Sequence, residues 1–167
     1  MTTTYEPIAT TTLGSASASI AFSSIPSTYT DLRISTVLFP GTSSRMQING
    51  DTGTNYSSTF LYTVNTTPGP GSRTNDTHIP FLLAAAVGTT IPVMATIDIF
   101  SYTNTAGWKN VLWQESADKN GDASPHWVVS GFGLWRSTSA ITSINLFNTG
   151  FTFAAGSTAT LYGIKAE

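Results

Sequence analysis

The loop around residue 120 is the segment of this sequence whose residue types and spacing could bind a metal ion. Oxygen-bearing side chains occupy alternate positions there, at Asp118, Asn120, Asp122 and Ser124. Calcium is bound in proteins by carboxylate and amide oxygens at this alternating spacing. The pattern departs from a complete calcium loop, because Ala123 stands where glycine is needed and Val129 where a bidentate glutamate is needed.

A β-hairpin turn explains the same residues without a metal ion. The pair Asn120-Gly121 is a strong short-range signal for a turn with positive φ, and strand-like segments flank it at 108–115 and 127–136. We therefore expect a hairpin here and no required cofactor. Calcium held by Asp118, Asn120 and Asp122 stays as the alternative.

Several large aromatic side chains could form a platform for stacking against sugar rings: Trp108, Trp113, Tyr56 and Tyr62. Aromatic rings also pack cores and subunit interfaces, and an apolar stripe along one side of a strand is usually buried. Trp127 and Trp135 share strand parity with Val129, and this predicts such a buried stripe. Both interpretations stay open: a glycan-stacking site, and a packed core or interface.

No arrangement of reactive residues in this sequence indicates an enzyme. The chain has no cysteine, and it lacks the motifs of a serine nucleophile elbow, a zinc protease, a phosphate-binding loop and a dinucleotide-binding turn. The two histidines, His78 and His126, stand in loop-like settings close to prolines. The nine acidic residues include no pair whose local spacing marks a general acid and base. We therefore expect a protein that is not an enzyme.

The composition excludes several classes of partner. Charged residues make up 10% of the 167 positions and the net charge is −2, so no long-range field attracts nucleic acid or an anionic membrane. The longest apolar run, 79–87, contains Pro80 and is too short to cross a bilayer. Arg33 is the first positive side chain and residues 1–12 contain no apolar run, so we expect no signal peptide.

These residues must be positioned by β-strands. Serine and threonine make up about three residues in ten, and no stretch has the apolar spacing of a helix. We expect about ten strands, at 8–13, 16–22, 29–39, 45–48, 56–64, 91–102, 108–115, 127–136, 141–147 and 159–165. In the third of these, Leu32, Ile34, Thr36 and Leu38 should share one side. The spacing predicts one all-β domain over residues 1–167, an antiparallel β-sandwich.

Three segments do not read as ordinary strands. Residues 65–76 should form a long loop, because their Pro-Gly-Pro-Gly run cannot hold a strand ladder. Residues 79–87 fit either a short helix or a buried strand, because FLLAAA favours helix while Pro80 and Gly88 bracket it. The Thr-rich residues 1–12 could form an arm that docks on a neighbouring subunit, or could be frayed.

Three stretches carry a resemblance to a known family: YEPIATTTLGSASASIAFSSIPSTYTDLRI at 5–34, GDTGTNYSST at 50–59 and ITSINLFNTGFTFAAGSTATLYGIKAE at 141–167. Together they resemble a family of small virion proteins of tailed bacteriophages, many of them uncharacterised. The resemblance is one of strand and turn motifs, and residues 65–135 contribute no motif to it. It implies a jelly-roll-type sandwich that serves as a structural particle protein on the capsid or tail, and it implies no functional residues.

A capsid decoration (cement) protein is the function that we expect from these observations, located in the virion after assembly in the host cytoplasm. Such a protein stabilises a shell because it binds the assembled lattice and not free subunits. The expected partners are the major capsid protein or tail proteins of the same particle, and other copies of the chain, with a homotrimer favoured. The alternatives are a tail-associated receptor-binding or carbohydrate-binding module that recognises a host glycan, and a tail or baseplate adaptor.

Overall fold

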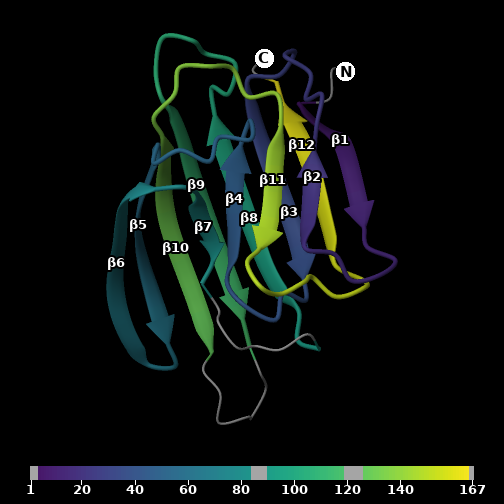
Figure 1. Ribbon diagram of the computed structural model, residues 1–167, viewed down its shortest axis with the longest axis vertical. Helices are drawn as coiled ribbons and strands as arrows, with labels where there is room; N and C mark the ends of the chain where they lie inside the picture. Colours follow the sequence, from purple (N-terminus) through teal and green to yellow (C-terminus); the bar gives the residue numbers. More distant parts are fainter. Residues whose placement is uncertain (1–3, 84–89, 119–125, 166–167) are drawn as a thin grey trace.

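The computed structural model describes residues 4–83, 90–118 and 126–165, which form twelve antiparallel strands in two sheets (Figure 1). The larger sheet has eight strands in the order β1 (Tyr5–Thr12), β12 (Thr158–Ile164), β3 (Asp31–Leu38), β8 (Val93–Phe100), β9 (Lys109–Ala117), β10 (Trp127–Trp135), β5 (Tyr56–Val64) and β6 (Thr67–Asp76). The smaller sheet has the order β2 (Ser19–Phe22), β11 (Ile144–Asn148), β4 (Ser44–Ile48) and β7 (Ile79–Leu82). The predicted all-β sandwich is therefore confirmed.

The strands pair in a nested way. β1 pairs with β12, β2 with β11, β3 with β8 and β4 with β7, and successive pairs alternate between the two sheets. Two further hairpins, β5–β6 and β9–β10, are not among these four pairs. They lie side by side in the larger sheet, because β10 pairs with both β9 and β5. They widen the larger sheet beyond the part that the nested pairs form.

The core lies between the sheets and follows from the two-residue period of the strands. In β3 the side chains of Leu32, Ile34, Thr36 and Leu38 are buried, as predicted. In the neighbouring strands Ile97 and Trp113 stand beside Ile34 in register and are also buried. Burying each large apolar side chain stabilises the fold by about 1.5–3 kcal/mol, so this inner layer supplies most of the driving force.

The predicted loop at 65–76 is wrong, because Thr67–Asp76 forms the edge strand β6, paired with β5. An edge strand tolerates proline where the ring nitrogen faces away from the neighbouring strand. Pro68 and Pro70 are two residues apart and so share one orientation. The glycines that follow them, Gly69 and Gly71, fit beneath aromatic rings, since a Cβ at Gly71 would lie 2.1 Å from Phe60 Cε2. The alternation of proline and glycine thus suits an edge strand.

The structure describes most of two further segments whose conformation the sequence left open, residues 1–12 and 79–87. Residues 5–12 are not a free arm: they form β1, which pairs with β12, and Thr10 Oγ1 lies 3.0 Å from Thr160 Oγ1. Threonine favours strands, and three consecutive threonines end this segment. Ile79–Leu82 is strand and not helix, with all four side chains buried in β7. Residues 1–3 and 84–87 of these two predictions lie outside the described residues.

Candidate functional site

One face of the larger sheet carries most of the exposed apolar side chains. We define the outer sheet face as the outward-pointing side chains of β3, β8, β9, β10 and β5, the ones that turn away from the smaller sheet. Ten large hydrophobic side chains are exposed among the described residues, and seven of them lie on this face: Val37, Leu61, Met94, Phe100, Leu112, Val128 and Phe132. Leu61 is 68% exposed and Val128 59%. Such a concentration on one face marks a contact surface.

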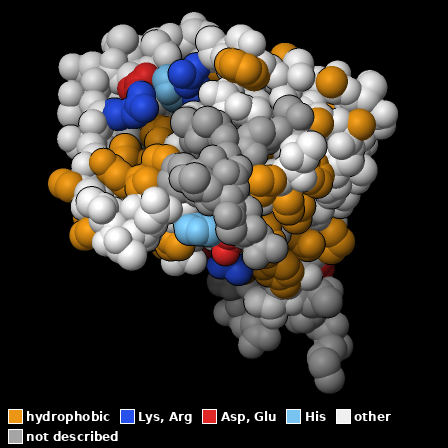
Figure 2. All heavy atoms as spheres, turned by 90° about the horizontal axis from the view of Figure 1, so that it is seen from below, with side chains coloured by type: hydrophobic (Ala, Val, Ile, Leu, Met, Phe, Trp, Pro, Cys, Tyr) orange, Lys and Arg blue, Asp and Glu red, His pale blue; other side chains and the backbone are white. Residues whose placement is uncertain are grey.

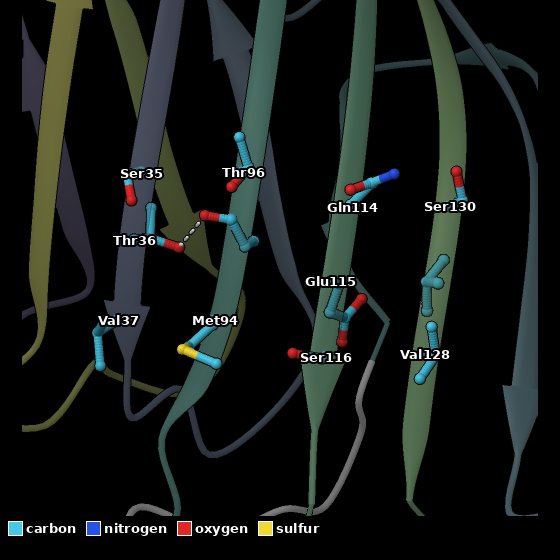
Figure 3. Close-up of a pocket in the computed structure, with 12 residues that line it drawn as sticks. Ser35, Thr36, Val37, Met94, Thr96, Gln114, Glu115, Ser116, Val128 and Ser130 are labelled. Atoms are coloured by element: carbon cyan, nitrogen blue, oxygen red, sulfur yellow. Dashed lines mark hydrogen bonds between the residues drawn. The ribbon is translucent and has the colours of Figure 1, made fainter.

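The outer sheet face has a hollowed centre. Short polar side chains stand in one register row across four strands there: Ser35, Thr96, Gln114 and Ser130. The next row, which lies lower in Figure 3, contains Val37, Met94 and Val128. Together these two rows line an open depression of about 480 Å³ (Figure 3). The depression exposes both hydroxyl or amide groups and apolar side chains to whatever covers this face.

Charge is scarce on the outer sheet face. Within these five strands, which the structure describes completely, Asp31, Arg33 and Asp98 are the charged residues that point outward. Arg33 donates two hydrogen bonds to Asp98, from Nε to Oδ1 at 2.5 Å and from the guanidinium to Oδ2 at 2.9 Å. Asp31 lies at the end of β3 and accepts a hydrogen bond from the Ser101 backbone N–H at 2.7 Å. The centre of the face therefore carries no unbalanced charge.

The four aromatic residues predicted for glycan stacking do not form one exposed platform. Trp113 and Tyr56 are buried in the core, because both point inward from their strands. The Tyr56 hydroxyl donates to the carbonyl of Asp51 at 3.0 Å, and burial raises its pKa to about 12. Tyr62 is half-buried against Trp127, with ring centroids 6.1 Å apart. Only Trp108 of the four is freely exposed, at 56%.

The predicted calcium site falls mostly outside the described residues. Asn120 and Asp122 lie in the segment 119–125, so the structure places neither. Asp118 is described, and its Oδ1 lies 2.8 Å from His126 Nδ1. No cluster of three or more acidic or histidine side chains that could hold a metal occurs in the described parts of the chain. The hairpin itself is present, because β9 and β10 pair along their whole length.

His78 is the more buried of the two histidines. Its Nδ1 lies 3.1 Å from Asp76 Oδ1, and its Nε2 is buried with no hydrogen-bond partner among the described residues. Burial lowers the pKa of His78, Asp76 opposes this shift, and the positive charges of Arg45 and Arg73 add to it. The ring also stands edge-on to Phe147, with centroids 6.3 Å apart. These contacts give His78 a structural position between β6 and the smaller sheet.

Two buried charged residues on β9 were missed by the sequence analysis. Lys109 is buried, and its ammonium donates hydrogen bonds to the backbone carbonyls of Gly107 at 3.0 Å and Thr138 at 3.3 Å, and also to that of Asn104. Glu115 is buried too, and its Oε2 accepts a hydrogen bond from the Leu83 backbone N–H at 2.7 Å. Both share parity with Trp113, so the two-residue period of this strand could have located them. They hold loops at the two ends of the strand.

The comparisons with known proteins supply no relative for these features. No protein-family model matches the chain, and no curated protein matches its sequence. In the described ranges there is no helix long and apolar enough to cross a membrane. The outer sheet face therefore stands as the candidate functional site on its geometry alone.

Proposed function

We propose that this chain is a structural protein of a tailed-bacteriophage particle and that it decorates the capsid shell. The observation that carries the proposal is the nested pairing of β1 with β12, β2 with β11, β3 with β8 and β4 with β7 across two sheets. This is the wrapping expected of a jelly roll, a fold that capsid domains use. It fits the resemblance of residues 5–34 and 141–167 to small virion proteins.

The surface of the domain supports an assembly role. A structural particle protein must desolvate a broad area when it assembles with other subunits, copies of itself included, and uncharged side chains make that desolvation cheap. The outer sheet face provides exposed apolar side chains such as Met94 and Val128 beside hydroxyl groups, with few charges among them. Figure 2 shows that on the end of the molecule seen from below the charged side chains gather in small groups, with apolar and uncharged side chains between them.

The glycan-binding alternative receives less support. A stacking platform needs several exposed rings, whereas Trp113 and Tyr56 are buried and Tyr62 is half-buried. Trp108 is left as a single exposed ring of the four. We therefore keep a tail-associated receptor-binding module or adaptor as an outcome of the experiment below and not as a second proposal.

The experiment compares phage particles that lack this protein with wild-type particles after heating and osmotic shock. If the protein cements the shell, the deficient particles lose infectivity at lower temperature, and adding the purified protein restores their resistance. Equal resistance of the two particles would contradict cementing. Cryo-EM of wild-type particles then locates the protein: density on the icosahedral shell supports decoration, and density confined to the tail replaces it with the tail-associated alternatives.

A further inference from the structure

We propose that the outer sheet face is a homotypic interface, covered by the same face of a second copy of this chain. The inference concerns self-association of the chain and does not depend on the particle to which the protein belongs. It rests on three properties of the face: its apolar side chains, its balance of charge and its extent.

The distribution of exposed apolar side chains points to this face and no other large surface of the described chain. Val37, Met94 and Val128 form one register row, and Leu112 and Phe132 stand side by side in another. In an antiparallel sheet with one face in water, these positions ordinarily carry polar side chains. Leaving them exposed costs free energy that packing against another apolar surface recovers, at about 25 cal/mol per Å².

The charge of the face suits a second copy as the occupant. A face of one sign repels its own copy, and a partner of opposite charge would be required. Here Arg33 and Asp98 neutralise each other through two hydrogen bonds, and the remaining outward charge, Asp31, lies at one end. Two identical faces can therefore approach without like-charge repulsion at their centres.

The extent of the face suits a small but specific dimer interface. Five strands spaced about 4.8 Å apart, with about seven residues in each at about 3.4 Å per residue, present roughly 570 Å². Two such faces would bury roughly 1,140 Å² in total, above the total of about 1,000 Å² that a specific protein–protein interface should exceed. Two sheets packed face to face also keep their strand directions within about 30° of each other, which lets most of the area make contact.

The register of the strands suggests how two copies fit. We place a two-fold axis parallel to β9, midway between the two faces. Rotation about this axis reverses the order of the strands in the second copy, so β8 of one copy lies over β10 of the other. Positions along the strands do not change, so each register row lies over the same row of the second copy. Met94 then faces Val128 of the second copy, and Thr96 faces Ser130 of the second copy. Leu112 and Gln114 lie on the axis and face their own equivalents. The strands of two packed sheets cross at an angle of up to about 30°, so residues far from the axis do not stay opposite one another. The match is therefore best close to β9.

The first test is the mass of the protein in solution, measured by light scattering after gel filtration. We expect a mass near twice the 17.7 kDa of one chain. Val128→Lys and Met94→Lys should each halve this mass, because two added charges would face a desolvated surface. The matched control is Phe151→Lys, since Phe151 is 57% exposed and lies outside the five strands. Circular dichroism checks that each variant stays folded.

The second test uses the absence of cysteine in this chain, so that one introduced thiol is the only thiol. Position 112 lies on the proposed axis, so Leu112→Cys should be captured as a covalent dimer by a short bis-maleimide. Phe151→Cys should give no more dimer than random collision does. Any one of three results would overturn the proposal. The first is a wild-type mass of one or three chains, and the second is dissociation by Phe151→Lys as complete as that by Val128→Lys. The third is equal cross-linking of the two cysteine variants. If the wild type is monomeric and Val128→Lys abolishes binding to particles, the face belongs to a particle subunit instead.

Discussion

The two faces of the larger sheet are built from the same strands and differ in what covers them. On β9, Val111 and Trp113 point inward and are buried, whereas Leu112 points outward and is exposed. On β10, Val129 is buried and Val128 is exposed. The inner face is covered by the smaller sheet, whereas no strand of the described residues covers the outer sheet face. This difference shows that apolar side chains on a strand do not by themselves identify a core. They become a core only where a second layer of the fold, here the smaller sheet, packs against them.

The largest expected effect comes from emptying the inner face. Trp113→Ala removes a buried indole that is 1% exposed, so it should lower the free energy of unfolding by about 3–5 kcal/mol, measured by urea denaturation. Leu112→Ala, the next residue along the strand, should change it by less than about 0.5 kcal/mol when measured on dilute protein. Similar losses from the two substitutions would break the comparison between the faces.

A smaller effect is expected from overfilling the inner face. A Cβ added at Gly131 would lie 2.1 Å from Trp113 Cζ2, so Gly131→Ala must displace a buried ring. We expect a loss of about 1–3 kcal/mol in urea denaturation. Gly107→Ala is the matched control, because no atom lies within 4 Å of the Cβ it would add. An unchanged midpoint for Gly131→Ala would mean that the inner layer is more loosely packed than the structure indicates.

The contrast between buried and exposed groups extends to His78. Burial lowers its pKa from the usual 6.5, so between the lowered pKa and 6.5 the unfolded chain binds more protons than the folded one. The free energy of unfolding should therefore fall as the pH falls through this window. His78→Asn should flatten this part of the pH profile of the thermal midpoint. A profile that keeps its slope in the variant would assign the effect to another group.

The smallest effect is expected on the outer sheet face itself. Asp98→Asn removes the partly exposed ion pair with Arg33, and such pairs contribute about 0.2–1 kcal/mol. We expect a change at the low end of this range, with a weaker dependence on salt than in the wild type. A loss of several kcal/mol in urea denaturation of dilute protein would show that this pair is held in a far drier environment than an open sheet face provides.

The sequence supports the class of fold more firmly than the details of the site. Alternation in β3 correctly predicted a strand and the set of residues that share its buried side, because a two-residue period reflects the local geometry of the backbone. The edge strand β6 was taken for a loop, since proline and glycine are common in both and only the neighbouring β5 shows that Gly69 and Gly71 lie beneath rings. For Trp113 and Tyr56 the choice between an exposed platform and a packed core stayed open for a related reason: strand parity tells which residues share a side, but not which side faces the core.

What this sequence determined by itself is therefore local: a hydroxyl-rich chain of strands with few charged residues, a low net charge and no cysteine. The tertiary structure decided which strands pair and which side is covered. Both depend on contacts between residues far apart in the chain, such as Thr10 with Thr160 or Ile34 with Leu161, and no local pattern specifies such contacts. The smaller sheet has four strands against eight, and it is placed over one face only. That placement turns one set of apolar side chains into a core and leaves Met94, Leu112 and Val128 as a surface.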